Sequence, residues 1–239
     1  MPRSRVLLVA ALAIACQREP PHEQAAPTPQ AAPAMPTIRF VEQFERGADA
    51  SAPLLVVLHG RGDSAENFVA LWRGFPAQLE IAAAAAPIPT GDGGEWYHPH
   101  PDMTDHELAV AVDAAEARLW PAIRERARGR KLLVAGFSQG AVLSYVLAAR
   151  HPDEIAYAFP IAGRMPRELL PMPGTRTAPI FALHGTDDPV IGIAEARPAI
   201  AAFQAAGRPT ELRAYPGVGH TITPEMYRDL VEHIVAALK

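Results

Sequence analysis

The sequence has 239 residues, of which 49% are hydrophobic and 20% charged, and a formal net charge of −4 at pH 7. These proportions are those of soluble globular chains, so they exclude a wholly disordered or fibrous protein. The acidic balance argues against a nucleic-acid partner, because such binding rests on a basic surface that neutralises phosphates. The length allows a core that needs neither disulfides nor a structural metal.

Residues 1–15 have the layout of a secretory signal peptide, with two early arginines before an apolar run that is too short to span a bilayer. Cys16, the only cysteine, follows directly. Residues 12–16 resemble a bacterial lipobox, in which the cysteine is lipidated after cleavage. The lipobox usually has Leu where this chain has Ala13, and Ala13 with Ala15 also fits an ordinary A-x-A cleavage site. Both processing routes predict export.

The segment 16–36 is the predicted tether. Residues 17–36 contain six prolines and almost no bulky apolar side chains. Such a segment does not bury enough surface to offset its ordering entropy, so we expect an extended linker. Gln17 replaces the Asp that tends to retain lipoproteins at the inner membrane, so lipidation predicts an outer-membrane envelope lipoprotein. Cleavage without lipidation predicts a periplasmic or secreted protein.

Residues 37–239 alternate apolar runs with helical stretches, which is typical of an α/β domain. The continuous apolar run 54–58 predicts a strand that is buried on both faces. Further strands are predicted at 81–86, 131–137, 155–161, 179–183 and 211–215. Helices are predicted at 65–79, 105–128, 139–150, 193–206 and 224–238, with a Gly- and Pro-rich loop ending near residue 103.

The strongest chemical signal is a G-x-S-x-G motif centred on Ser138. It lies between a predicted strand and a predicted helix, which is the context that gives this motif its meaning. The flanking glycines permit a tight turn that exposes the serine hydroxyl, and the following helix N-terminus favours developing negative charge. Ser138 is therefore the predicted nucleophile.

A serine nucleophile requires a histidine base and an acid that orients it. His220 lies in a Gly-rich loop after the last predicted strand, where a base can reach the serine. Asp187 and Asp188 both follow the strand 179–183, and the hydrolase motif H-G-x-x-D, counted from His184, selects Asp188 and leaves Asp187 as the alternative. The chain order Ser, Asp, His is that of α/β-hydrolases.

The remaining histidines have structural interpretations. His59 and His184 each end a strand and precede a glycine, which indicates turn residues. His151 and His233 lie on or beside helices and are expected to be solvated. His22 falls in the tether.

The loop at 59–64 follows the first buried strand and supplies the other part of the predicted site. The backbone N–H of Arg61, together with that of Gln139, forms a predicted two-donor oxyanion hole. The tripeptide that begins at Arg61 is also an adhesion motif, which we interpret as an accident of this loop.

Four segments together resemble the phospholipase/carboxylesterase family of α/β-hydrolases, which includes the acyl-protein thioesterases. They are residues 58–63, 136–140, 184–190 and 215–220. The resemblance implies an α/β-hydrolase fold in one domain, with a mostly parallel sheet and helices on both faces. It also implies a serine hydrolase that cleaves small-molecule carboxylic esters or thioesters without a cofactor, and aromatic residues, here Trp96 and Tyr97, in a wall of the substrate cleft.

Two features distinguish this chain from the thioesterases of the family. Those members usually have an apolar residue at the position of Arg61, and they are usually cytosolic, whereas this chain has export features. Both differences weigh against a role as a protein depalmitoylase.

The segment from His98 to His106 superficially resembles a metallo-hydrolase zinc motif. Its final Asp-His spacing is wrong and two prolines restrict the loop, so no metal is predicted. Two other functions remain open: another exported α/β-hydrolase, such as a peptidase or a polyester or feruloyl esterase, and a noncatalytic envelope-binding lipoprotein.

Overall fold

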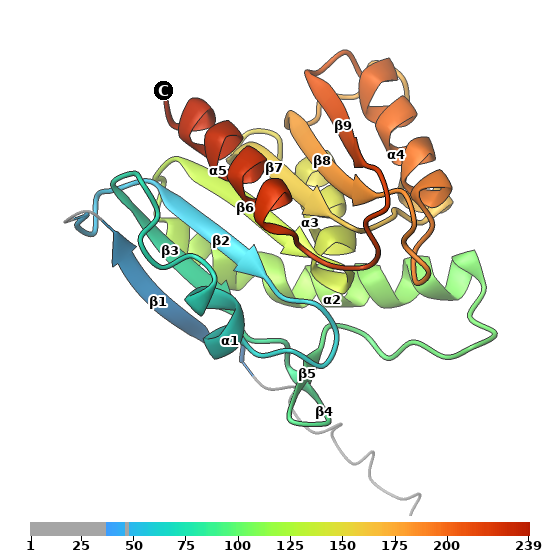
Figure 1. The fold of residues 1–239 in the computed structure, drawn as a ribbon, viewed down its shortest axis with the longest axis horizontal. Helices are drawn as coiled ribbons and strands as arrows, with labels where there is room; N and C mark the ends of the chain where they lie inside the picture. The colour runs from blue at the N-terminus through green and yellow to red at the C-terminus, as the bar shows by residue number, and fades with distance from the viewer. Residues whose placement is uncertain (1–36, 46–47) are drawn as a thin grey trace, which may run out of the picture. The chain divides into compact units, whose positions relative to one another are not determined.

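A seven-stranded sheet runs through the computed structural model, which describes residues 37–45 and 48–239 (Figure 1). The strand order is β1-β3-β2-β6-β7-β8-β9; β1 is antiparallel to β3, and the other pairs are parallel. The strands are β1 (Phe40–Glu45), β2 (Leu54–Leu58), β3 (Leu79–Ala84), β6 (Leu132–Phe137), β7 (Ile155–Ile161), β8 (Ile180–Gly185) and β9 (Thr210–Tyr215). A separate small hairpin joins β4 (Ile88–Thr90) to β5 (Gly93–Glu95).

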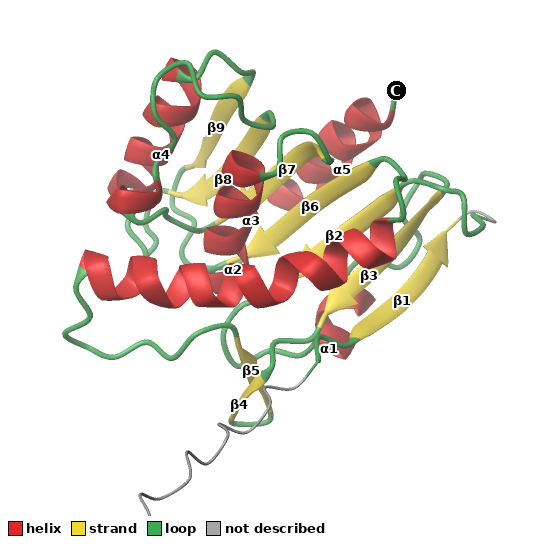
Figure 2. Cartoon of the chain, turned by 180° about the vertical axis from the view of Figure 1, so that it is seen from behind, coloured by secondary structure: helices red, strands yellow, loops and turns green. Residues whose placement is uncertain are grey.

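Helices cover both faces of the sheet. One buried cluster packs α2 (Asp105–Ala127), α3 (Gln139–Arg150) and α4 (Ile193–Ala205) against one face. A second packs α1 (Ala65–Ala70) and α5 (Pro224–Leu238) against the other. Figure 1 shows α5 in front of the sheet, and Figure 2, from behind, shows α2 crossing in front of it. Because both faces are covered, every residue of β2 is buried, as its apolar run predicts.

Three local features differ from the predictions. The helix predicted at 65–79 ends at Ala70, because Gly74 adopts a positive φ of 75° and Pro76 follows two residues later. The predicted Gly-rich loop contains the β4–β5 hairpin. The edge strand β1 and a 3-10 turn at Arg167–Leu169 had no distinct sequence signal.

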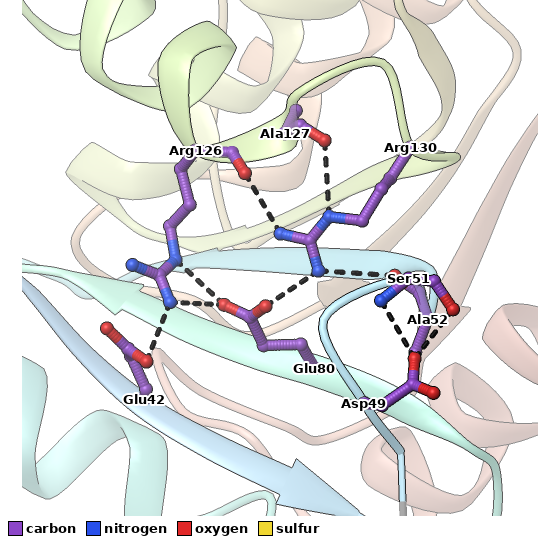
Figure 3. Close-up of polar contacts among 8 residues, drawn as sticks. All are labelled: Glu42, Asp49, Ser51, Ala52, Glu80, Arg126, Ala127 and Arg130. Atoms are coloured by element: carbon purple, nitrogen blue, oxygen red, sulfur yellow. Dashed lines mark hydrogen bonds and ion pairs between the residues drawn. The ribbon is translucent and has the colours of Figure 1, made fainter.

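An ion-pair network centred on the buried Glu80 joins β1, β3 and the end of α2 (Figure 3). Glu80, 2% exposed, pairs with Arg126 and with Arg130, whose Nη1 lies 2.7 Å from its Oε2. Arg126 also reaches Glu42 at 2.8 Å, and Arg130 donates to the carbonyl oxygen of Ala52. The network fixes the C-terminal end of α2 against two strands.

The predicted signal peptide, Cys16 and the tether lie outside the described residues, so their interpretation stays a prediction. Among residues 37–45 and 48–239, no helix is long and apolar enough to cross a membrane.

Candidate active site

Ser138 lies at a sharp turn between β6 and α3, with φ 55° and ψ −115°. A non-glycine residue at positive φ is strained, and such strain concentrates at functional sites. The flanking glycines allow close packing: a Cβ on Gly136 would collide with the backbone of Gly140, and a Cβ on Gly140 with the carbonyl of Leu58. The strained backbone conformation is therefore that of Ser138 itself. The two glycines allow this strand-to-helix turn, the nucleophile elbow (residues 136–140), to approach β2 closely.

The structure brings together the three residues predicted for a triad. The Oγ of Ser138 lies 2.9 Å from Nε2 of His220, and Nδ1 of His220 lies 2.7 Å from Oδ2 of Asp188. The imidazole ring packs against Phe137, with ring centroids 4.9 Å apart. Each residue follows the carboxyl end of a different strand, β6, β8 or β9, so the parallel sheet gathers them at one edge.

The Asp188 side chain is inaccessible to solvent, and hydrogen bonds to both of its oxygens favour the charged form. Its Oδ1 accepts the backbone N–H groups of Val190 and Ile191, both at 2.9 Å. Burial alone would raise the pKa of Asp188, but the hydrogen bonds from His220 and from these two amides outweigh it, so the pKa is lowered. The Asp187 side chain is exposed, and among the described residues the Thr186 hydroxyl donates to it at 2.7 Å.

Two backbone donors adjoin the serine. Gln139 is the first residue of α3, where the N–H groups have no intrahelical acceptor, and Arg61 follows the end of β2. Within the described part of the chain, neither amide donates to another residue. The β4–β5 hairpin holds the Arg61 loop, because Gly62 donates to Gly94 and Gly94 donates to Asp63, both at 2.9 Å.

A cleft of about 470 Å³ opens over Ser138 and His220. Its apolar lining includes Leu108, Val142 and Ile191, and Tyr97 contributes an aromatic wall. Burial raises the pKa of Tyr97, so this phenol stays neutral. The prediction that Trp96 forms part of the cleft wall is wrong. It is 1% exposed and lies outside the lining, because its indole N–H donates to the carbonyl of His59 at 2.8 Å.

Three polar side chains at or behind the cleft were not predicted to contribute to the site. The side-chain amide of Gln139 accepts from the N–H of Trp96 and donates to the carbonyl of Tyr97, both at 3.0 Å, which ties the aromatic segment to the elbow. Glu95 is buried behind Arg61, and Arg164 lines the cleft. An acidic residue directly before two aromatics is the only sequence signal for Glu95.

His59 and His184, which were predicted to be turn residues, are packed inside the protein. His59 and His184 are buried and bonded to backbone, His59 at the carbonyl of Gly60 and His184 at that of Ile191, both at 2.7 Å. Burial lowers the pKa of His59.

The prediction that His151 and His233 are solvated is wrong. Both are half-buried: His151, at the C-terminal end of α3, stacks on Trp120 with 3.6 Å between ring centroids, and His233 on α5 stacks on Phe181 at 3.5 Å. In the described ranges, no three His, Cys, Asp or Glu side chains gather in a way that would hold a metal ion, and the 98–106 segment is no exception.

The fold and its elbow define an α/β-hydrolase, as predicted. The family model for Phospholipase/Carboxylesterase matches residues 113–238, and the chain belongs to this family of hydrolases.

The chain is similar to acyl-protein thioesterase 1 of Debaryomyces hansenii, with 30% identity over 46% of this chain and 49% of that protein, so it spans about half of that relative. Esterase YpfH of Escherichia coli is 27% identical over 76% of this chain and 81% of its own length. Among solved structures, esterase PE8 superposes with a TM-score of 0.75 at 20% identity, over 84% of this chain and 99% of that one, which establishes the fold.

Proposed function

We propose that this chain cleaves carboxylic esters or thioesters, with Ser138 as nucleophile, His220 as general base and Asp188 as the residue that orients the imidazole. The observation that carries the proposal is the unbroken hydrogen-bond chain from Ser138 through His220 to Asp188 beneath an open cleft. The esterase and thioesterase names of the relatives support the same substrate class.

The proposed reaction has two halves. The Oγ of Ser138 attacks the carbonyl carbon while its proton passes to Nε2 of His220, and the amides of Arg61 and Gln139 donate to the oxyanion. His220 then gives that proton to the departing oxygen or sulfur, which leaves an acyl-serine. In the second half a water, deprotonated by His220, attacks the acyl carbon; the acid is released and the proton returns to Ser138.

Asp188 contributes through its charge. It accepts a hydrogen bond from the Nδ1–H of His220, which fixes the tautomer whose unprotonated Nε2 faces the serine. It also stabilises the imidazolium formed in each half-reaction. The lowered pKa of Asp188 keeps this carboxylate ionised at neutral pH.

The test is covalent labelling by a fluorophosphonate probe, together with hydrolysis of para-nitrophenyl esters of increasing chain length. The wild-type protein is expected to label once and to turn over these esters. Ser138→Ala is expected to abolish labelling and to lower turnover by roughly 10⁴-fold or more, because triad residues act as a unit. Full labelling of Ser138→Ala would refute the nucleophile, cleavage of peptides alone would favour a peptidase, and an inert wild type would favour a binding protein.

We also propose that the protein is exported and anchored by a lipid on Cys16. The support is the apolar run directly before the only cysteine and the Pro-rich segment after it. The mature wild-type protein is expected to partition into detergent and to incorporate labelled palmitate, and Cys16→Ser to do neither while retaining turnover in vitro. A soluble, unlipidated wild type would overturn the anchor.

A further inference from the structure

Two arginines, Arg61 and Arg164, line the cleft, and they differ in what already neutralises them. Arg164 lies between two carboxylates, with Nη1 at 3.2 Å from Asp105 and Nε at 3.3 Å from Glu195. Arg61 contacts one carboxylate, and only through Nε, at 3.0 Å from Glu95. Arg164 is therefore engaged within the protein, whereas most of the Arg61 guanidinium faces outward.

Among the described residues, the two Nη groups of Arg61 have no hydrogen-bond acceptor. Apart from Glu95 at Nε, no acceptor within residues 37–45 and 48–239 takes a hydrogen bond from this guanidinium. The side chain is 53% exposed, so these two groups are accessible from the cleft. A guanidinium held at Nε presents the paired Nη donors that bind a carboxylate or a phosphate bidentately.

Glu95 holds this guanidinium in place. Its side chain is 1% exposed, and its second oxygen is occupied by Nδ1 of His98 at 2.6 Å. A carboxylate is rarely buried unless its partners pair with it, so its position depends on Arg61 and His98. The hairpin that carries Glu95 is bonded to the Arg61 loop through Gly94, and a Cβ on Gly93 would collide with the carbonyl of Asp63. Both ends of the ion pair are thus fixed by backbone.

We infer that the guanidinium of Arg61 binds an oxyanion, a carboxylate or phosphate, on the ester or thioester substrate. The inference rests on the proposed function, since it names the substrate class of the same site. Leu108, Val142 and Ile191 accept the apolar part of the substrate, while Arg61 selects a charged group near the reacting carbonyl. Preferred substrates are therefore acidic amphiphilic esters rather than neutral ones.

The experiment compares matched ester pairs and reads the ratio of kcat/KM within each pair. One pair places the charge on the acyl side: para-nitrophenyl hydrogen adipate against para-nitrophenyl hexanoate. The other places it on the alcohol: para-carboxyphenyl against para-carbamoylphenyl hexanoate. Fluorophosphonate titration of Ser138 counts the active sites of each variant.

In at least one pair, Arg61→Gln is expected to lower the anionic-to-neutral ratio by roughly ten- to hundredfold, mainly through KM, as for loss of a charged hydrogen-bonding pair. The anionic-to-neutral ratio of Arg61→Lys is expected to lie between those of the wild type and Arg61→Gln. Lysine retains the positive charge and a partner for Glu95 but lacks the planar pair of donors. Raising the ionic strength is expected to lower the wild-type ratio and not that of Arg61→Gln. Arg73→Gln, which removes an exposed positive charge outside the cleft, should leave the ratio within about twofold.

Unchanged ratios in both pairs for Arg61→Gln and Arg61→Lys would overturn the inference. If the neutral esters are still hydrolysed and Ser138 still labels, that failure concerns Arg61 alone. A wild-type protein that neither labels with the fluorophosphonate nor hydrolyses the neutral esters would instead refute the proposed function.

Discussion

Four carboxylates are buried in the described part of the chain, two in each of two regions. Asp188 and Glu95 lie at the carboxyl edge of the sheet, and the side chains they hold face the cleft: His220 is 16% exposed and Arg61 53%. Glu80 and Glu116 lie on the α2 side, away from the cleft. Glu80 holds Arg126 and Arg130, which are themselves 21% and 12% exposed.

The comparison shows that a buried carboxylate paired with a basic side chain can serve either the active site or the stability of the fold. A buried carboxylate is tolerated only when cations and hydrogen bonds compensate its desolvation. On the α2 side the partners of each carboxylate are held within the protein, so Glu80 fixes β3 to the end of α2, and Glu116 fixes α2 to the end of α3. At the sheet edge the paired side chains, His220 and Arg61, remain partly accessible from the cleft. Removing the carboxylate should therefore impair activity at the edge and stability at α2.

The largest effect is expected for Asp188→Asn. The carboxylate of Asp188 that accepts a hydrogen bond from the Nδ1–H of His220 is then missing, so the correct tautomer is no longer favoured. The kcat on activated esters should fall by about 10⁴. The unfolding free energy should change by only about 1 kcal/mol, since an Asn Oδ1 still accepts the amides of Val190 and Ile191. Steady-state kinetics and urea unfolding measure the two quantities.

Asp187→Asn is the matched control. The Asp187 side chain is exposed and accepts a hydrogen bond from the Thr186 hydroxyl, away from His220, so its neutralisation should lower kcat by about threefold at most. The reverse ranking in two folded variants would give the acid role to Asp187.

The second prediction concerns stability. Glu80→Gln leaves Arg126 and Arg130 without the carboxylate between them and should destabilise the protein by about 3 kcal/mol, while kcat stays unchanged. Glu42→Gln is the control, because Glu42 is 45% exposed and its loss should cost about 0.5 kcal/mol. A loss of kcat in Glu80→Gln at unchanged stability would contradict the division between the two regions.

The fold was largely predictable because its signals are local. Continuous apolar runs marked β2, β6 and β7, and periodicity marked α3 and α5 to the residue. The hairpin β4–β5 was missed, since three-residue strands in a Gly-rich loop gain their order from contacts with the 60–63 loop. α1 was predicted too long because Gly74 and Pro76 outweigh apolar periodicity.

The site was predictable where a motif carries the chemistry. Ser138, Asp188 and His220 each follow a strand, and parallel strands bring their carboxyl ends to one edge. The environment of Arg61 was not predictable, because its pairing with Glu95 joins positions 34 residues apart through side-chain geometry. Trp96 was misplaced for a related reason: spacing shows that an aromatic is near the cleft but not which way its ring points.

Among the variants of buried carboxylates, the smallest effect is expected for Glu116→Gln. Burial would raise the pKa of Glu116, but bonds to His151 at 2.6 Å and Arg150 at 3.1 Å outweigh it and lower the pKa. A carboxylate with a lowered folded-state pKa stabilises the fold above its ordinary range near 4.5, and this contribution is lost as the pH falls through the lowered value.

The difference in unfolding free energy between wild type and Glu116→Gln should therefore be about 1 kcal/mol at pH 7 and vanish in acid, once the pH has fallen below the lowered pKa of Glu116. It should be smaller than for Glu80→Gln, because Arg150 is 36% exposed and keeps Asp113 as a second partner at 2.6 Å. Urea unfolding of both proteins at several pH values measures it. A difference that persists undiminished in acid would mean that packing, not charge, gives Glu116 its role, and Glu116 would no longer belong beside Glu80 in the comparison.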